Sequence, residues 1–456
     1  MAAARVMRRH GLPVTLIDEG PQLGGRYYKQ FAAAPGIARG AEIDRLAQEG
    51  QAQAGTIVRD GVTLRADALA WGLFPERQLA LYSGGQVDLL EPEAIVLATG
   101  AVERVAAFPG WTLPGVATAG GVQTILSREG ILAGRRFLVA GTGPLLLAVA
   151  LEIAEAGGQV VAVIEGSAAT APLRHIHHFL GQGRRLRQAL DYERALHQRG
   201  VPIHRGQMVV AAEGEGELQA VTVARIDRDW HVVPGHEMRY DVDTLCLHYG
   251  FVASTELARM VECEVAYAPE RGGWYVVHDD GMRTTRPGIY VAGQAGGIGG
   301  ADLAEATGEL AGMTVARDLG ALDDAGYRDV ADAARRDVQR GWEFARVLNT
   351  VYAPGVGLSD PITSDTTICR CEEVTAGALD TALAHGARTL NDVKRRTRCG
   401  MGLCQAKVCS SILSAYMARA GMSPEEAGLI TSRPPIRAIP LEALAVLGHR
   451  TVDAAT

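Results

Sequence analysis

Residues 136–165, RFLVAGTGPLLLAVALEIAEAGGQVVAVIE, decide the fold of the chain. An apolar run from Arg136 leads into the turn Gly141-Thr142-Gly143, and a helical stretch to Glu155 follows. A second apolar run then ends on Glu165. A strand, a helix and a second strand in this order predict a parallel sheet, because a returning parallel strand needs a crossover connection.

Motifs on both sides of this segment indicate another nucleotide-binding unit, which the segment interrupts. Their strands end in glycine-containing turns, as strands do where a nucleotide passes close to the backbone. In chain order, the motifs are a helix (1–11), a strand (14–18), the pair Gly24-Gly25, a strand (94–98) that ends in Thr99-Gly100, and a strand (288–292) that enters a glycine-rich turn (293–300) and a helix of small residues.

Composition and charge limit the class of protein. At 456 residues the chain is long enough for two or three domains, and 47% hydrophobic and 21% charged residues are typical of a globular protein. The net charge of -7, with no long basic stretch, argues against nucleic acid or an anionic membrane surface as a partner. We therefore expect a folded protein that does not bind nucleic acid.

We expect no transmembrane segment and a cytoplasmic location. The most apolar stretch, residues 137–150, contains two glycines and a proline and is shorter than the ~20 residues that a membrane-spanning helix needs. The first residues are basic and amphipathic and lack the apolar core of a signal peptide. Seven cysteines, five of them within residues 369–409, favour a reducing compartment over a disulfide framework.

The cysteines near the C-terminus are spaced like the ligands of a metal centre. One residue separates Cys369 from Cys371, and the intervals between Cys399, Cys404 and Cys409 each enclose four residues. The spacing alone allows two sets of four ligands. Cys369 and Cys371 can be completed either by Cys399 and Cys404 or by Cys404 and Cys409.

The surroundings of these cysteines suit a [2Fe–2S] cluster. Such a cluster needs four thiolates and backbone N–H groups that point at the sulfurs, and Gly400 and Gly402 permit this close approach. A helix that begins at Cys409 would direct the positive end of its dipole at the anionic cluster. A structural zinc site with the same four ligands is the alternative.

The stretches CRCEEVT (369–375) and VKRRTRCGMGLCQAKVC (393–409) resemble the bacterioferritin-associated-ferredoxin-like (BFD-like) domains that are fused to flavoproteins. The shared pattern is Cys-x-Cys, 32 intervening residues and Cys-x4-Cys. The resemblance implies a [2Fe–2S] cluster and leaves Cys399 as a fifth thiol that binds no iron. The implied ligands are Cys369, Cys371, Cys404 and Cys409.

The first nucleotide-binding unit contains residues suited to an adenosine nucleotide. An acid at the tip of the second strand of a dinucleotide fold binds the ribose hydroxyls, and Glu19, five residues before Gly24, is expected in this role. The other residues expected at this cofactor are Gly24, Gly25, Thr99, Gly100, Gly293 and Gln294.

The order of these motifs resembles that of thioredoxin-reductase and glutathione-reductase flavoproteins, which have two dinucleotide-binding domains. The resemblance implies an α/β flavoprotein with bound FAD, followed by a small helical BFD-like [2Fe–2S] domain. The expected divisions are an FAD-binding domain in two segments (1–125 and 263–320), a second nucleotide-binding, NAD-like domain (126–262), a helical linker (321–364), the BFD-like domain (365–425) and a C-terminal tail (426–456).

Two departures from that pattern concern the FAD site. The Gly-x-Gly-x-x-Gly loop and first strand that precede the helix 1–11 in such proteins are missing, so we expect a truncated or misassigned start. Their loss removes amides that cradle a pyrophosphate and leaves neighbouring strands without a partner. Gln294 stands where relatives carry an aspartate for the ribityl or phosphate part of the flavin, and glutamine can still form hydrogen bonds.

The glycine turn within residues 136–165 is an incomplete second nucleotide motif. Leu146 stands where a third glycine allows close packing of helix on strand. Gly141 and Gly143 remain to shape the turn, and Glu165, 24 residues after Gly141, is placed to bind a ribose. NAD, ATP and an empty site all remain open at this point.

Four further segments carry a resemblance that covers most of the chain. They are LIDEGPQLGGRYYKQ (16–30), VLATGAVER (96–104), FPGWTLPGVATAGGVQ (108–123) and VAGQAGGIGGADLAEATGELAG (291–312). They are similar to the A (alpha) subunits of opine oxidases, the B subunit of hydrogen cyanide synthase and the alpha subunits of hydroxyproline and proline dehydrogenases. The resemblance implies an electron-transfer flavoprotein and iron–sulfur subunit of a multi-subunit dehydrogenase or oxidase that acts on the C–N bond of an amino acid, imino acid or opine.

This resemblance also implies a partner. The partner is a flavin-containing catalytic (beta or B) subunit of the glycine-oxidase type, and an FMN at the interface between the subunits and a small third subunit are further options. The chain alone shows no motif for an acid–base pair that would oxidise an amine, so no catalytic residue is assigned. The alternatives are a self-contained NAD(P)H-dependent reductase that passes electrons through the cluster, and a non-catalytic assembly or redox-sensing subunit.

Overall fold

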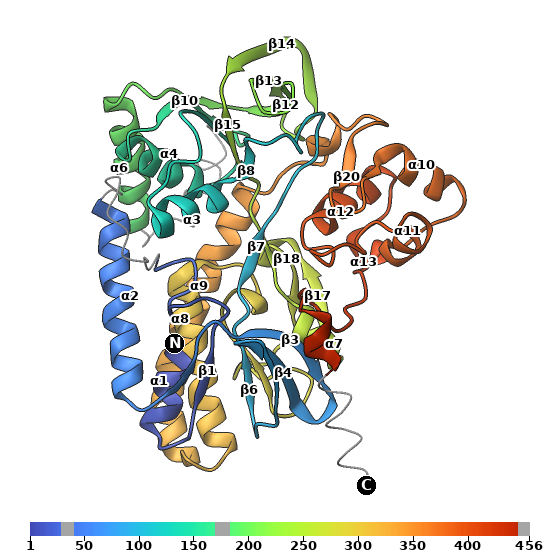
Figure 1. The fold of residues 1–456 in the computed structure, drawn as a ribbon. Coiled ribbons are helices and arrows are strands. Elements are labelled where there is room, and N and C mark those ends of the chain that lie inside the picture. The colour runs from blue at the N-terminus through green and yellow to red at the C-terminus, as the bar shows by residue number, and fades with distance from the viewer. Residues whose placement is uncertain (29–40, 169–182, 446–456) are drawn as a thin grey trace.

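The computed structural model describes residues 1–28, 41–168 and 183–445. In Figure 1 these residues form a lower body of strands and long helices, an upper body built on a sheet, and a helical module beside both. The lower body contains the first strands of the chain and also the long helices that follow the upper body in the sequence. This is the interrupted arrangement that the order of motifs predicts.

Among the described residues, the upper body is built on a parallel sheet with the order β11 (Ile203–Arg205), β10 (Gln159–Glu165), β9 (Arg136–Gly141), β15 (Thr244–His248) and β8 (Val116–Thr118). Its helices are α3 (Ala119–Glu129), α4 (Leu145–Glu155) and α6 (Gly183–Gln198). The helix α4 connects β9 to β10, which confirms the predicted strand–helix–strand unit. Leu138 and Val139 point to opposite faces of β9 and are both fully buried, because both faces of the sheet are covered.

The lower body contains short parallel ladders. The strand β1 (Thr15–Ile17) pairs with β2 (Thr63–Arg65), and β6 (Ile95–Leu97) pairs with β19 (Ile289–Val291). No strand of the described residues joins the β1 ladder to the β19 ladder.

Helices of small residues cover these ladders. The helix α1 (Ala2–Arg9) packs against α8 (Gly300–Asp318), and a Cβ atom at Gly312 would lie 2.7 Å from the carbonyl oxygen of Ala3. The charged helix predicted after α8 is α9 (Asp324–Val351), which packs along α8. The other elements of this body are α2 (Ala41–Arg59), α7 (Glu256–Met260), the antiparallel strands β3 (Leu69–Phe74), β4 (Gln78–Ser83), β5 (Gln86–Leu90), β17 (Val265–Ala268) and β18 (Gly273–Val276), and the 3₁₀ turns η1 (Pro75–Arg77), η3 (Pro269–Arg271) and η4 (Gly293–Gly296).

An antiparallel pair, β7 (Ala101–Glu103) and β16 (Phe251–Ala253), connects the two bodies. The expected division at residue 125 falls inside α3, whose neighbours β8 and β15 belong to the upper sheet. A second, antiparallel sheet covers one end of the upper body and consists of β12 (Gln207–Glu213), β13 (Ala220–Ile226) and β14 (Val232–Asp241).

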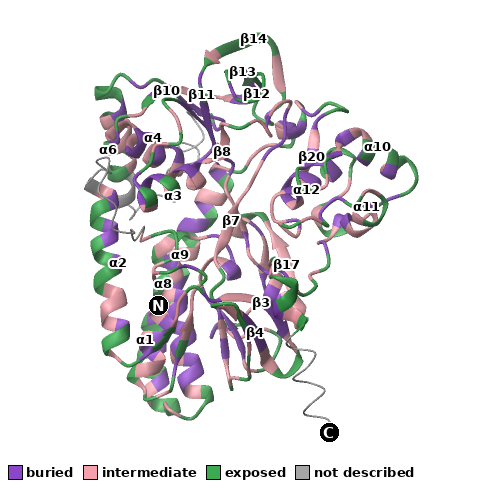
Figure 2. Cartoon of the chain, viewed as in Figure 1, coloured by how far each residue is buried: buried purple, intermediate pink, exposed green. Residues whose placement is uncertain are grey.

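The helical module is separate from the sheets but shares the core of the upper body. Its elements are the turn η5 (Val356–Ser359), the strands β20 (Thr367–Cys369) and β21 (Val374–Thr375), and the helices α10 (Ala376–Ala384), α11 (Leu390–Thr397), α12 (Cys409–Arg419) and α13 (Pro424–Ala427). Its buried side chains and those around Leu138 form one continuous apolar cluster. Figure 2 shows the same burial inside the module.

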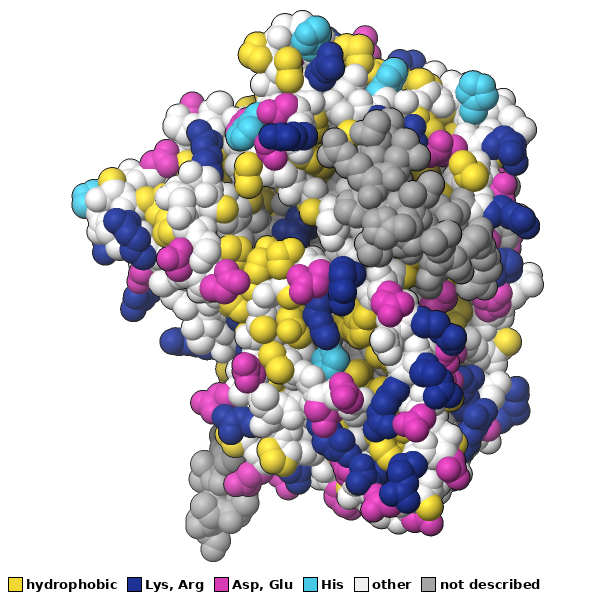
Figure 3. All heavy atoms as spheres, turned by 180° about the vertical axis from the view of Figure 1, so that it is seen from behind, with side chains coloured by type: hydrophobic (Ala, Val, Ile, Leu, Met, Phe, Trp, Pro, Cys, Tyr) yellow, Lys and Arg dark blue, Asp and Glu magenta, His cyan; other side chains and the backbone are white. Residues whose placement is uncertain are grey.

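Charged side chains of both signs are mixed on the surface. On the face opposite to Figure 1, basic and acidic side chains lie interspersed over the lower half (Figure 3). Within the described ranges, none of the helices combines the length and apolarity that a membrane crossing requires.

We expect the substitution Leu138→Ala to lower the free energy of unfolding by about 2–5 kcal/mol, because it leaves a cavity in a fully buried strand of the upper sheet. Leu190→Ala on α6 is the matched control, since 61% of the Leu190 side chain is exposed, and it should change stability by less than about 0.5 kcal/mol. Chemical denaturation of both variants measures the difference, and equal losses would contradict the burial described above.

Candidate metal centre and flavin site

The cysteines of the helical module converge at its centre. The Sγ atoms of Cys369, Cys399 and Cys409 all lie within 4.8 Å of one another. The thiols of Cys371 and Cys404 lie in hydrogen-bonding contact beside this trio. Cys409 is the first residue of α12, as the sequence predicts. The structure thus brings the expected ligands together and adds Cys399 to the group.

Backbone N–H groups are directed at the sulfurs of this cluster. The amides of Gly400 and Glu372 donate to Cys369, and the amides of Ala406 and Val408 donate to Cys404. Ala406 has a positive φ of 66°, which turns the chain back over Cys404. A [2Fe–2S] cluster is held by cysteine sulfurs that also accept hydrogen bonds from backbone amides, so these residues fit such a cluster.

Glycines allow the cysteine loops to approach each other. A Cβ atom at Gly402 would lie 2.1 Å from the Cβ atom of Cys371. A Cβ atom at Gly400 would lie 2.8 Å from Ile430, and φ there is +83°. Both positions therefore require glycine, which confirms the loop predicted from the sequence.

The surroundings of Cys369 favour its protonated thiol. A hydrogen bond with Cys409, together with burial, raises the pKa of the Cys369 thiol far above its ordinary value. A cluster would therefore have to supply positive iron to hold this group as a thiolate. Cys246 and Cys263 lie outside the module and are buried among packing residues.

The module is fixed to the upper body by hydrogen bonds as well as by its apolar core. The indole Nε1 of Trp111 donates to the carbonyl oxygen of Thr367 at 2.6 Å, two residues before Cys369. The hydroxyl of Ser411 on α12 donates to the carbonyl oxygen of Val105 at 3.2 Å. Both contacts hold the cysteine-bearing segments against the flavoprotein bodies.

The glycines predicted at the flavin site have the backbone that such a site needs. Gly24 and Gly25 have φ values of +113° and +57°, and Gly100 has +72°. No atom lies within 4 Å of a Cβ placed at Gly25 or Gly100, so open space lies above this backbone for a cofactor. Thr99 shapes the turn, because its hydroxyl donates to the carbonyl oxygen of Ser254 at 2.6 Å.

The turn η4 carries the other two residues that the sequence predicts at the flavin, Gly293 and Gln294. The amide of Gly293 donates to the hydroxyl of Thr307 at 2.9 Å, which anchors the turn on α8. The side-chain oxygen of Gln294 accepts a hydrogen bond from the amide of Gly299 at 3.0 Å. Gln294 thus stabilises the turn, a role that the sequence did not indicate. These residues, with the open backbone at Gly25 and Gly100, fit a bound FAD.

Glu19 has a partner that sequence reasoning missed. Its carboxylate is 51% exposed and forms an ion pair with Arg437, with the closest atoms 2.8 Å apart. Arg437 belongs to the tail, which runs along β3, where the amide of Ile436 donates to the carbonyl oxygen of Trp71 at 2.9 Å. The ion pair uses Oε2 of Glu19, and Oε1 remains for a ribose hydroxyl.

The residues predicted at the second nucleotide site do not form an open site. The carboxylate of Glu165 accepts hydrogen bonds from the amides of Gly143 and Ser167 at 3.0 and 2.9 Å. Burial raises its pKa. The Gly143 amide, which a pyrophosphate would use, is therefore already occupied, and Gly141 packs directly against the carbonyl oxygen of His248.

Aromatic side chains pack beside this loop. The Cβ and Cγ atoms of Tyr352, at the end of α9, lie 3.9 Å from a Cβ placed at Gly143. A Cβ atom at Gly166 would lie 2.2 Å from the indole of Trp230. Burial raises the pKa of Tyr352 to about 12, so its hydroxyl stays protonated at neutral pH. The loop is thus in contact with Tyr352, and Glu165 accepts a hydrogen bond from its Gly143 amide.

Two family models match the chain. The model described as pyridine nucleotide-disulphide oxidoreductase matches residues 1–308, and the model described as BFD-like [2Fe-2S] binding domain matches residues 367–419.

Two curated relatives match almost the whole chain. Among the opine oxidase A subunits, that of Rhizobium meliloti (strain 1021) is 32% identical over 457 residues, which cover 98% of this chain and 96% of that protein. The HcnB protein of hydrogen cyanide synthase from Pseudomonas aeruginosa is 31% identical over 456 residues, which cover 98% of this chain and 96% of that protein.

A solved structure shares the fold. The crystal structure of L-proline dehydrogenase from P. horikoshii superimposes with a TM-score of 0.67 at 19% identity, and the match covers 97% of this chain and 76% of that chain. Together with the family models, this match confirms the predicted fold class. The models also confirm FAD and a [2Fe–2S] cluster as the cofactors.

We expect Cys404→Ser to lose most of the iron and acid-labile sulfide, because the four-thiolate set would be broken. Cys399→Ser is the matched control, since it removes one thiol from the same loop and should keep two irons and two sulfides per chain. Iron and sulfide analysis of the anaerobically purified variants measures both. Loss of the cluster in the Cys399 variant with retention in the Cys404 variant would show that the buried trio supplies the ligands.

We expect no saturable binding of NAD⁺ to the chain loaded with FAD, because Glu165 and Tyr352 occupy the glycine loop. Isothermal titration calorimetry at millimolar NAD⁺ tests this expectation. Stoichiometric binding that the substitution Glu165→Gln abolishes would show that the loop opens for a dinucleotide.

Proposed function

Because this chain belongs to the family of opine oxidase A subunits and HcnB, and is an FAD-dependent oxidoreductase with a BFD-like [2Fe–2S] domain, we propose that it is the electron-transfer subunit of a heteromeric enzyme. We propose that the enzyme oxidises the C–N bond of an amino acid, imino acid or opine. Bound FAD exchanges electron pairs, and a [2Fe–2S] cluster passes single electrons.

The observation that carries this proposal is the attachment of the cysteine module to a flavin-binding body within one chain. Trp111 and Ser411 tie the module to the segment that follows β7, and β7 itself leaves the turn Thr99-Gly100 at the flavin site. The residues of this chain therefore position the two cofactors relative to each other. A protein that passes electrons from a two-electron flavin to a one-electron cluster must hold the two cofactors in a fixed arrangement.

The partner and the finer assignments belong to the same proposal. The partner is a flavin-containing catalytic subunit of the glycine-oxidase type, with an interface FMN and a small third subunit as options. We place the complex in the cytoplasm, in keeping with the seven free cysteines of the described residues. We assign the cluster to Cys369, Cys371, Cys404 and Cys409, and we keep the domain divisions at 125, 262, 320, 364 and 425 as proposals.

The contacts of the glycine loop favour this proposal over the alternative of a self-contained NAD(P)H-dependent reductase. Such a reductase needs a nucleotide at Gly141–Gly143, where Tyr352 and Glu165 now lie. The electrons must then enter from another protein.

We expect the chain to oxidise neither amino acids, opines nor NADH when it is purified alone. Coexpression with a flavin-containing partner subunit of the glycine-oxidase type should give a complex that oxidises one of these amines and reduces an artificial one-electron acceptor. Steady-state assays on the chain, the partner subunit and the complex measure the three activities.

The control is a complex that contains the Cys404→Ser variant, which should still assemble but transfer electrons to the acceptor poorly. Oxidation of NADH by the chain alone, with turnover through the cluster, would contradict the proposal and favour the reductase.

A further inference from the structure

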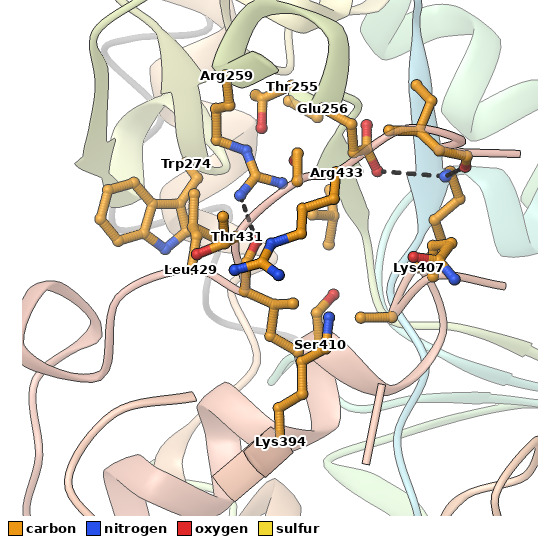
Figure 4. A pocket seen from close by; sticks show the side chains of 17 residues that line it. Thr255, Glu256, Arg259, Trp274, Lys394, Lys407, Ser410, Leu429, Thr431 and Arg433 are labelled. Atoms are coloured by element: carbon orange, nitrogen blue, oxygen red, sulfur yellow. Dashed lines mark hydrogen bonds and ion pairs between the residues drawn. The ribbon is translucent and has the colours of Figure 1, made fainter. Parts of the chain in front are cut away.

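A cavity lies where the cysteine module, the lower body and the tail meet. Its volume is about 60 Å³. The module contributes Lys394 on α11 and residues 405–407 and 410, the lower body contributes Arg259 and Trp274, and the tail contributes residues 429–433 and 436. Figure 4 shows that these side chains enter the cavity from separate elements. None of the cluster cysteines or of the residues expected at the flavin lines it.

Three residues that line the cavity each have a buried hydrogen-bond donor without a partner. Among the described residues, these donors are the Nε atom of Arg259, the Nε1 atom of Trp274 and the hydroxyl of Ser432. A buried donor without a partner is unfavourable, so three in one lining indicate a ligand that accepts hydrogen bonds.

The charge of the lining selects an anion. The cavity is lined by the basic residues Arg259, Lys394, Lys407 and Arg433 and by one acidic residue, Glu256. Glu256 lies 3.7 Å from Lys407, which also donates to the carbonyl oxygen of Ile436 at 2.9 Å.

The other basic side chains form no ion pair in the described part of the chain. Within residues 1–28, 41–168 and 183–445, neither Lys394 nor Arg433 forms an ion pair. Arg259 uses one guanidinium nitrogen to donate to the carbonyl oxygen of Ile430 at 2.7 Å, which fixes its position without neutralising it. The cavity therefore has an excess of positive charge.

The iron–sulfur cluster accounts for part of this charge but not for the unpaired donors. Lys394 and Lys407 belong to the cysteine module, where an anionic cluster would attract them. Arg259 and Trp274 belong to the lower body and Ser432 to the tail, so an anion separate from the cluster would pair with their donors.

We propose that this cavity binds a phosphate group, either inorganic phosphate or the phosphate of a phosphomonoester. A tetrahedral oxyanion has enough acceptor oxygens to pair with the guanidinium, indole and hydroxyl donors at once. A volume of about 60 Å³ is the space of roughly four or five waters, which suits one such group. Arg433 is exposed, so a larger phosphomonoester can extend past it to solvent.

A phosphate here would connect three parts of the chain that carry the electron-transfer machinery. Lys394 belongs to the cysteine module, Arg259 to the lower body and Arg433 to the tail, and each would contact the same anion. The tail residue Arg437, four positions after Arg433, pairs with Glu19 at the flavin site. The ligand therefore stabilises the seating of the module and tail on the flavin body, a property that goes beyond the proposed enzymatic function.

The test is equilibrium dialysis of the full chain, loaded with both cofactors, against radiolabelled inorganic phosphate. We expect saturable binding of one phosphate per chain and a rise in the thermal unfolding temperature. Arg433→Ala should weaken binding about tenfold or more, because it removes an exposed charge-assisted donor without disturbing the core. Trp274→Phe should also weaken binding, because it removes the indole N–H donor and keeps an aromatic side chain.

Arg396→Ala is the matched control, because Arg396 is an exposed basic residue on the same helix as Lys394 but does not line the cavity. It should bind phosphate like the unmodified chain. Competition with glycerol phosphate separates the two sources: tighter binding of the ester indicates a phosphomonoester, and weaker binding indicates inorganic phosphate.

Absence of saturable phosphate binding, or equal loss in the Arg396 and Arg433 variants, would overturn the proposal. This assay measures binding alone and needs no partner protein. If no phosphate binds, the proposed electron-transfer function still stands. If the complex fails to transfer electrons, the measured phosphate binding still stands.

Discussion

The structure depends on the apolar core that the cysteine module shares with the upper body. Leu138 in the central sheet and the buried cysteines Cys369 and Cys409 belong to one continuous cluster of side chains. The module is therefore not attached by a flexible linker; it is packed as a part of the flavoprotein. Electron transfer between two cofactors requires them to be held at a fixed separation, and this shared core supplies that constraint.

The upper body has the topology of a nucleotide-binding domain, and contacts within the chain hold its glycine loop. The glycine turn, β9 and β10 belong to the expected strand–helix–strand unit, the carboxylate of Glu165 accepts a hydrogen bond from the Gly143 amide, and Tyr352 lies against the loop. Tyr352 ends α9, which packs on α8 in the lower body, and the chain continues from there into the cysteine module. The loop thus lies where both bodies and the approach to the module meet.

Sequence reasoning predicted the parts of this molecule that short-range patterns determine. The strand–helix–strand unit followed from apolar runs and a glycine turn, and the cysteine loop followed from ligand spacing together with Gly400 and Gly402. Leu146 was correctly interpreted as a departure from the nucleotide motif, and it is fully buried on α4.

Contacts between segments far apart in the sequence could not be predicted in this way. Arg437 lies 418 positions after its partner Glu19, and Trp230 reaches Gly166 from another sheet. The place of Cys399 beside Cys369 and Cys409 was missed for the same reason, because spacing gives the order of ligands but not the depth at which each thiol lies. The unpaired donors of Arg259, Trp274 and Ser432 also become visible only when three distant segments meet.

The most direct test of the electron-transfer role is an anaerobic titration of the assembled complex with its amine substrate, followed by electron paramagnetic resonance. The account predicts that substrate alone, without dithionite, produces a rhombic S = 1/2 signal from a reduced [2Fe–2S] cluster, and that the isolated chain gives no signal with the same substrate. A complex that oxidises its substrate at full rate while the cluster stays oxidised and silent, including when the external acceptor is withheld, would contradict it.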